Sequence, residues 1–144
     1  MTKTVSQKMG IKENSRSIFV NADQEVLENI KLPVLDIQET LEDEFDYIHL
    51  FVKTQTDFIE FFPKLKSHLK PSGMLWVSWP KGGKLGTDLN IKTVIKLGYD
   101  FGLVESICLS VNDIWSGLKF THPKKGKAYN NSYGKLNDKH NFVD

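Results

Sequence analysis

The sequence predicts an α/β fold in which a mostly parallel sheet lies between two layers of helices and ends in an antiparallel hairpin. Apolar runs of four to six residues alternate along the chain with segments of helical periodicity, the pattern of strands joined by crossover helices. The last two apolar runs are joined by Asn112-Asp113, a short turn that favours antiparallel pairing. These observations together describe a three-layer, Rossmann-like sandwich.

The first half of the chain is expected to supply three strands and one helix. Residues 17–20 form the first apolar strand, and residues 23–30 form a short helix whose apolar side chains share one face. Residues 32–37 are expected to add a short second strand, with Pro33 at its start, where a missing backbone donor is tolerated. After an acidic link, residues 47–52 are apolar almost continuously, as expected of a strand that is buried on both faces.

The second half is expected to begin with a helix and a central strand. The helix starts near Thr54 or Thr56, and Pro63 is expected to break it and to start a second helical piece. Residues 71–73 then turn the chain into the most hydrophobic strand, which spans residues 74–79.

A loop of lysines and glycines follows that strand and leads into the last predicted helix. Thr87 or Asp88 is expected to cap this helix, and Gly102 is expected to end it. The two strands of the hairpin then close the sheet, so the predicted domain spans residues 1–122. Residues 123–144 are polar and rich in lysine and asparagine, which predicts a flexible tail.

Composition limits the classes of function. The 144 residues suit a single core, with the 40% hydrophobic and 26% charged residues of an ordinary globular protein. A formal net charge of +1 disfavours nucleic acid as a partner, and no apolar run is long enough to cross a membrane. Cys108 is the single cysteine and the amino terminus lacks the apolar core of a signal peptide, so we expect a cytoplasmic protein.

Part of the chain is similar to a known family of enzymes. Residues 46–51, the helix that follows, and the segment LKPSGMLWV at residues 69–77 resemble the second half of a class I S-adenosylmethionine-dependent methyltransferase. That family has an aspartate-led strand, a helix, an LKPGG turn and a further strand in this order, and its terminal hairpin is similar to residues 103–120. The resemblance covers about residues 45–122 and implies the same Rossmann-like fold. The whole chain, from its QKMGI segment to its WSGLKF segment, also resembles a small bacterial family of domains of unknown function, which implies no activity.

The first half departs from the methyltransferase pattern. Those enzymes carry a glycine-rich loop after their first strand, and here residues 19–23 read FVNAD without a glycine. Asp36 is the only counterpart of the acidic residue that would hold the ribose, and residues 37–45 are too few for the usual helix and third strand. The resemblance therefore implies a truncated, degenerate scaffold, and we expect no ordinary cofactor.

The predicted binding site lies beyond the carboxyl ends of the parallel strands, where open α/β sheets bind ligands. The residues that could line it are Asn21, Asp23, Lys53, Lys81 and Lys84, with Trp79 as a wall. Their lysines suit a small anion or a nucleotide fragment, because they add charge beside the amino terminus of a helix. Two simpler interpretations stay open: Asp23 only caps a helix, and the lysine loop only connects a strand to a helix.

Other chemistry finds little support in the sequence. The loop at residues 81–84 lacks the spacing of either standard phosphate motif, and no histidine or cysteine has the spacing of a metal site. His49 lies within a buried strand and is expected to be a hydrogen-bonded core residue. The sequence thus favours a non-catalytic binding or protein-interaction module, with a small anion or a protein as its partner, and a divergent enzyme as the alternative. A monomer, or a weak homodimer through the edge of the hairpin, is expected.

Overall fold

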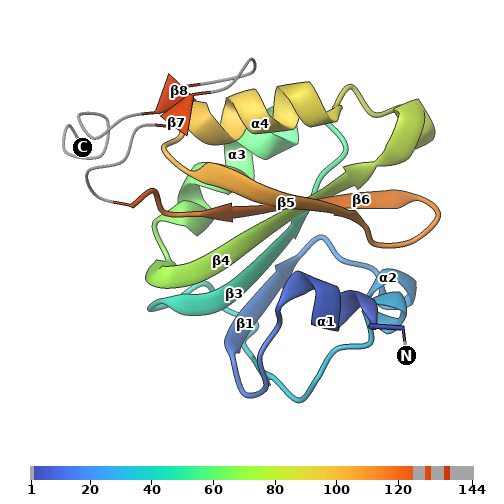
Figure 1. The fold of residues 1–144 in the computed structure, drawn as a ribbon, viewed down its shortest axis with the longest axis vertical. Coiled ribbons are helices and arrows are strands. Elements are labelled where there is room, and N and C mark those ends of the chain that lie inside the picture. The colour runs from blue at the N-terminus through green and yellow to red at the C-terminus, as the bar shows by residue number, and fades with distance from the viewer. Residues whose placement is uncertain (1, 125–128, 131–134, 137–144) are drawn as a thin grey trace.

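The computed structural model describes residues 2–124, 129–130 and 135–136, and it confirms the predicted α/β class. A six-stranded sheet with the order β2-β1-β3-β4-β6-β5 forms the middle layer. Figure 1 shows α1 and α2 together on one side of this sheet, with α3 and α4 on the other. The predicted antiparallel hairpin, β5 and β6, ends the sheet on one side.

The helices and strands follow the predicted order, with one additional short helix at the start. The first half contains α1 (Val5–Met9), β1 (Arg16–Val20), α2 (Gln24–Ile30), β2 (Asp36–Ile37) and β3 (Phe45–Phe51). The second half contains α3 (Gln55–Lys66), β4 (Leu69–Pro80), a 3-10 segment η1 (Lys81–Gly86), α4 (Ile91–Asp100), β5 (Val104–Ser110) and β6 (Trp115–Thr121). Two short strands, β7 (Tyr129–Asn130) and β8 (Lys135–Leu136), pair with each other in a separate small sheet.

Strand pairing places the switch in strand order between β1 and β3. From β1 the chain runs outward to β2 at the sheet edge, then returns to place β3 on the other side of β1. All of these pairs are parallel, as is the pair of β3 with β4. The link between β2 and β3 contains no helix or strand, in agreement with its predicted shortness. The carboxyl ends of β1 and β3 therefore diverge at one edge of the sheet.

Two hydrophobic clusters lie on the two faces of the sheet. One cluster packs Phe58 and Phe62 of α3 and Trp79 of β4 against α4, and the other packs Trp76 of β4 against α1 and α2. Trp76 and Trp79 are three residues apart, so strand alternation sends them to opposite faces. Trp76 is fully buried, as its place in the strand predicts.

Three local predictions are wrong. Pro63 lies inside the continuous helix α3, where the buried, stacked rings of Phe58 and Phe62 anchor the segment before it and buried Leu65 anchors the segment after it. Residues 71–73 do not form a turn, because β4 begins at Leu69 and takes up its irregularity as a register shift opposite β3. The cap of α4 is Asn90, whose side chain accepts from the N–H of Thr93.

The two residues expected to cap α4 instead tie the preceding loop to α3. Thr87 donates its hydroxyl hydrogen to the carbonyl oxygen of Lys53 at 2.6 Å. Asp88 accepts from the backbone N–H of Gln55 at 2.9 Å, at the first residue of α3. The expected end of α4 agrees better, since Gly102 follows it with a φ of 89°. The predicted flexibility of residues 123–144 falls mostly on residues outside those that the structure describes.

Candidate functional site

A cleft of about 500 Å³ opens at the carboxyl edge of the sheet, where β1 and β3 diverge. It is lined by Asn21, Asp23, Phe51, Val52, Lys53, Asp57, Glu60, Phe61 and Trp115. This position, beside the switch in strand order, is where open α/β sheets bind ligands. Its volume lies within the range of ordinary small-molecule sites.

Asn21 forms the turn that follows β1. Its φ of 63° is left-handed, a conformation that asparagine tolerates better than most residues other than glycine. The Asn21 side chain extends toward β3, and its Nδ2 donates to the carbonyl oxygen of Phe51 at 3.3 Å. An asparagine thus makes a turn that glycine would otherwise make, and its amide reaches across the gap between the two strands.

Asp23 belongs both to the cleft and to the helix that follows. Its Oδ1 accepts from the N–H of Val26 at 2.8 Å, so the expected capping role at the start of α2 is confirmed. A carboxylate has further acceptor sites, so a capping aspartate is still able to accept from a ligand. A ligand contact by Asp23 stays a prediction.

Charge in the cleft differs in sign from what an anion site needs. Lys53 brings one ammonium group, but the cleft also contains the carboxylates of Asp23, Asp57 and Glu60. Asp57 lies in the first turn of α3, which Thr54 caps through the N–H of Asp57. Three carboxylates and one ammonium make the cleft acidic, which favours a ligand with a positive charge or with several hydrogen-bond donors.

The other three predicted site residues do not line this cleft. The side chain of Lys81 donates to the hydroxyl of Ser110 on β5, and its backbone N–H donates to the carbonyl oxygen of Ile114 at 2.7 Å. Lys84 is exposed in the η1 segment, and Trp79 is only 4% exposed within the α3 and α4 cluster. The sheet edge therefore brings together Asn21, Asp23 and Lys53, and a ligand role for the other three is still a prediction.

Sequence reasoning missed the acidic and aromatic residues of the cleft. Asp57, Glu60 and Phe61 come from the start of α3, which leaves β3 at the carboxyl edge and so must face that edge. Trp115 begins β6, whose antiparallel pairing places its first residue opposite Pro80 at the end of β4. The position of the start of α3 and that of the first residue of β6 could both have been inferred from the sequence, because the helix and the hairpin were predicted.

Behind the cleft lies a series of aromatic ring contacts that leads into the core. The ring of Trp115 meets that of Phe51 edge-on at 5.3 Å, and Phe51 stacks on His49 at 4.3 Å. His49 is fully buried and contacts two hydroxyl groups: Tyr47 Oη at Nδ1 and Ser78 Oγ at Nε2, each at 2.7 Å. The expectation of a hydrogen-bonded core histidine is confirmed.

Burial sets the protonation of this network. Desolvation lowers the pKa of His49 from 6.5 to about 3, so the imidazole is neutral at physiological pH. Desolvation also raises the pKa of Tyr47 well above its ordinary value, which keeps the phenol protonated. A neutral imidazole offers one donor and one acceptor, so one hydroxyl donates to the ring and the other accepts from it.

Two further findings concern the described part of the chain. Within it, no three or more His, Cys, Asp or Glu side chains gather in a way that could hold a metal ion. None of its helices combines the length and the apolar character that crossing a membrane requires.

Comparison with known proteins gives the fold but no family. No protein-family model matches the chain, and no curated protein matches it either. Among solved structures, the ribosomal protein L11 methylase of Lactobacillus delbrueckii subsp. bulgaricus is similar, with a TM-score of 0.54 and 12% identity over 83% of this chain and 75% of that one. Magnesium protoporphyrin IX methyltransferase of Synechocystis PCC 6803, solved with bound SAH, has a TM-score of 0.53 and 12% identity over 81% and 78% of the two chains. A TehB-like SAM-dependent methyltransferase of Corynebacterium glutamicum has a TM-score of 0.52 and 8% identity over 82% and 85%.

These likenesses establish a methyltransferase-like Rossmann fold. At such low identity, similarity extends to the arrangement of helices and strands and carries no statement about activity. The part of the predicted resemblance that concerns the fold is therefore confirmed.

Proposed function

We propose that this chain is a divergent, methyltransferase-like domain that binds a small molecule in the carboxyl-edge cleft. The observation that carries the proposal is the position of the cleft at the carboxyl ends of β1 and β3, where the strand order switches. A fold leaves function open, but this location combines a suitable volume with polar and aromatic walls in the manner of ligand sites.

The chemistry of the cleft favours a cationic ligand with a flat or apolar part. The carboxylates of Asp57 and Glu60 attract a positive group and repel a phosphate. Phe61 and Trp115 supply apolar and aromatic surface. S-adenosylmethionine has a sulfonium cation, an amino group and a flat adenine ring, so it is the first ligand to test. When bound it would supply an activated methyl group, and Asn21 and Asp23, which line the cleft, would hydrogen-bond its polar groups.

A non-catalytic binding module is the second candidate, and Asn21 favours it. The turn after β1 carries an amide side chain, bonded to Phe51, at a place where close backbone approach to a ligand calls for glycine. In this case the cleft holds a small cationic molecule, or a side chain of a protein partner, without methyl transfer.

Calorimetric titration with S-adenosylmethionine, S-adenosylhomocysteine and pyrophosphate tests the proposal. Saturable binding of an adenosyl compound is the expected result, with little or no binding of pyrophosphate. Asp57→Asn combined with Glu60→Gln should weaken S-adenosylmethionine about two- to fivefold, because exposed charge pairs contribute up to about 1 kcal/mol. The matched control removes two exposed carboxylates of the β2–β3 link, Glu39→Gln with Glu42→Gln, and should leave affinity unchanged.

Two results would count against the proposed ligand or the proposed methyl transfer. Pyrophosphate binding that the paired cleft substitution strengthens, without any adenosyl binding, would overturn the cationic assignment. Binding of S-adenosylmethionine without slow formation of S-adenosylhomocysteine in the presence of cell extract would favour the non-catalytic candidate.

A further inference from the structure

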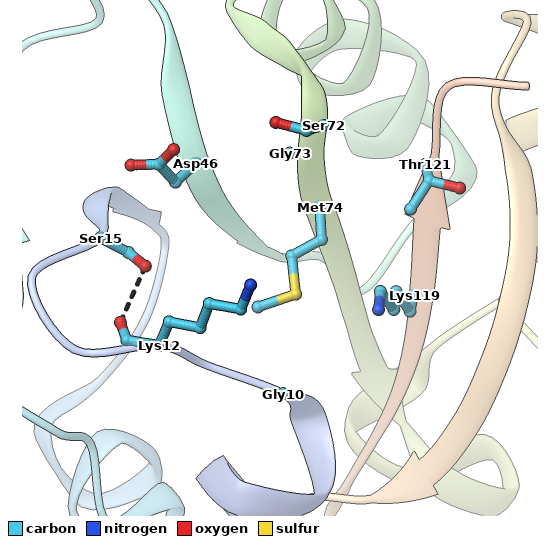
Figure 2. Close-up of a pocket in the computed structure, with 9 residues that line it drawn as sticks. All are labelled: Gly10, Lys12, Ser15, Asp46, Ser72, Gly73, Met74, Lys119 and Thr121. Carbon is cyan, nitrogen blue, oxygen red and sulfur yellow. Dashed lines mark hydrogen bonds between the residues drawn. The ribbon is translucent and has the colours of Figure 1, made fainter.

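A second cavity lies at the opposite, amino-terminal edge of the central strands. It has a volume of about 290 Å³ and is lined by Gly10, Lys12, Ser15, Asp46, Ser72, Gly73, Met74, Lys119 and Thr121. Figure 2 shows its three walls: the loop between α1 and β1, the beginning of β4, and the end of β6. It shares no residue with the carboxyl-edge cleft.

The loop that forms one wall is held in place by backbone hydrogen bonds, both within the loop and to the segment before β2. Gly10 ends α1 in a left-handed conformation with φ 77°, and the N–H of Asn14 donates to the carbonyl oxygen of Val34 at 2.7 Å. Ser15 donates both its N–H and its hydroxyl hydrogen to the carbonyl oxygen of Lys12. This wall is therefore a defined turn, and it presents the Lys12 side chain to the cavity (Figure 2).

The opposite wall exists because β6 exposes polar side chains where no helix covers the sheet. Lys119 pairs with Trp76 across the strands and points to the α1 and α2 face, as does Thr121 two residues later. Figure 2 shows Lys12 and Lys119 approaching Met74 from opposite sides. Met74 is almost buried and forms an apolar floor between the two ammonium groups.

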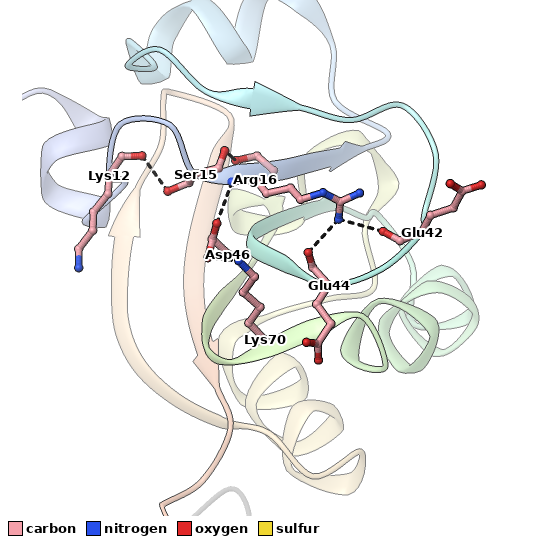
Figure 3. A network of polar contacts seen from close by, with 8 residues as sticks. Lys12, Ser15, Arg16, Glu42, Glu44, Asp46 and Lys70 are labelled. Atoms are coloured by element: carbon pink, nitrogen blue, oxygen red, sulfur yellow. Dashed lines mark hydrogen bonds and ion pairs between the residues drawn. The ribbon is translucent and has the colours of Figure 1, made fainter.

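In the described part of the chain, no acidic partner neutralises the two lysines. Among the described residues, neither Lys12 nor Lys119 has a hydrogen bond or an ion pair through its ammonium group. Asp46, the carboxylate in the lining, is already engaged: one oxygen accepts from the N–H of Arg16 at 2.8 Å and the other from Lys70 at 2.9 Å (Figure 3). Burial alone would raise the pKa of Asp46, but these two contacts hold that pKa below its usual value.

Charge around the cavity is therefore positive overall. Among the lining residues, Lys12 and Lys119 bring two ammonium groups against the single carboxylate of Asp46, which already pairs with Lys70 outside the lining. The hydroxyls of Ser72 and Thr121 add donors around the same space, whereas the hydroxyl hydrogen of Ser15 is already donated to Lys12.

We propose that this cavity binds a small phosphate-bearing anion between Lys12 and Lys119. A phosphoryl group carries up to two negative charges and several acceptor oxygens, which match two ammonium groups and a set of hydroxyl donors. The volume is at the low end of ligand sites, so it suits inorganic phosphate or a small phosphate ester and is too small for a dinucleotide. This site goes beyond the proposed function, because it lies at the other edge of the sheet and has the opposite charge.

Titration with inorganic phosphate, followed by NMR of methyl-labelled methionine, tests the site directly. Met74 lines the cavity, whereas Met9 is buried in the α1 and α2 cluster and serves as an internal reference. Phosphate replaces chloride at constant ionic strength, so that general screening does not change during the titration. The expected result is a saturable shift of the Met74 methyl signal and a small, unsaturated change at Met9.

Charge-removing variants assign the binding to the two lysines. Lys12→Gln and Lys119→Gln should each weaken phosphate about fivefold, and the double variant should abolish the saturable shift. Lys64→Gln, which removes an exposed ammonium from the last turn of α3, is the matched control and should bind phosphate as the wild type does. All three are substitutions of partly or fully exposed side chains, so circular dichroism should show an unchanged fold.

Several results would overturn this site: a Met74 shift that never saturates, a saturable shift that persists in the double variant, or loss of binding in Lys64→Gln. None of these depends on whether an adenosyl compound binds the carboxyl-edge cleft, so the two proposals can fail separately.

Discussion

The buried imidazole of His49 should make the free energy of unfolding fall as the pH falls. His49 is fully buried and its pKa is lowered from 6.5 to about 3 by desolvation, so the folded protein keeps the ring neutral in mild acid. The unfolded chain exposes the same ring with an ordinary pKa and takes up a proton below about pH 6.5. Since the unfolded state then binds more protons, stability is complete above the unfolded pKa and decreases below it.

The magnitude follows from the two pKa values. At about pH 5 the unfolded imidazole is almost fully protonated and the folded one is still neutral, which costs about 2 kcal/mol relative to about pH 8. This figure depends on the unfolded pKa alone, because any folded pKa near the value of about 3 leaves His49 neutral at that pH. For a domain of this size, about 2 kcal/mol is a large part of the total stability.

Urea unfolding followed by tryptophan fluorescence measures the effect, since all three tryptophans are buried. Other groups titrate in the same range, so the informative quantity is the difference between wild type and His49→Gln, which keeps a hydrogen-bonding side chain but cannot titrate. That difference should shrink by about 2 kcal/mol between about pH 8 and about pH 5. A difference that is constant with pH, or an NMR titration showing a folded His49 that is protonated near pH 6, would refute the reasoning.

Four other changes have expected outcomes. Gly98→Ala would place a Cβ 2.1 Å from Phe120 in the core, so it should lower the free energy of unfolding by about 1–3 kcal/mol or more in urea titrations. Asn90→Ala removes the side-chain cap of α4 and should cost about 1 kcal/mol, measured as a lower midpoint of thermal unfolding. Asp46→Asn breaks an ion pair whose side chains are 38% exposed, so it should lower the free energy of unfolding by less than about 1 kcal/mol at neutral pH. The loss should vanish as acid protonates the wild-type carboxyl below its ordinary pKa of 3.8. Asn21→Gly keeps the left-handed turn but removes the amide bond to β3, so calorimetry should show tighter binding of S-adenosylmethionine if that amide limits approach to the cleft.

The arrangement of strands was predictable because local patterns and chain direction determine it. Continuous apolar runs predicted buried strands, and the short turn at Asn112-Asp113 predicted the antiparallel hairpin that the structure confirms. The errors came from competition between local and tertiary preferences. Pro63 disfavours a helix interior locally, but the packing of Phe58 and Phe62 in the core keeps α3 continuous.

The site was harder to predict because its residues come from different elements. Chain order placed Asn21 and Lys53 at one edge of the sheet, and the structure brings both into the cleft. Strand alternation alone could not decide whether the Trp79 side chain is buried or exposed, because its burial depends on the packing of α4 over the end of β4. The net charge of the cleft could be predicted only from the path of α3. Its two carboxylates, Asp57 and Glu60, reverse the positive charge that the lysines suggested.

The opposite charges of the two edges separate their ligands on physical grounds. At the carboxyl edge, three carboxylates against Lys53 repel a phosphate, while at the amino edge the ammonium groups of Lys12 and Lys119 repel a sulfonium. Both sites are open to solvent, so each attraction is screened by salt, and raising ionic strength should weaken both ligands. A cation and an anion that occupy opposite ends of one rigid sheet also do not compete for the same residues. Phosphate should therefore leave the affinity for an adenosyl cation unchanged at constant ionic strength, and competition between the two would place them in one site and contradict this assignment of charge.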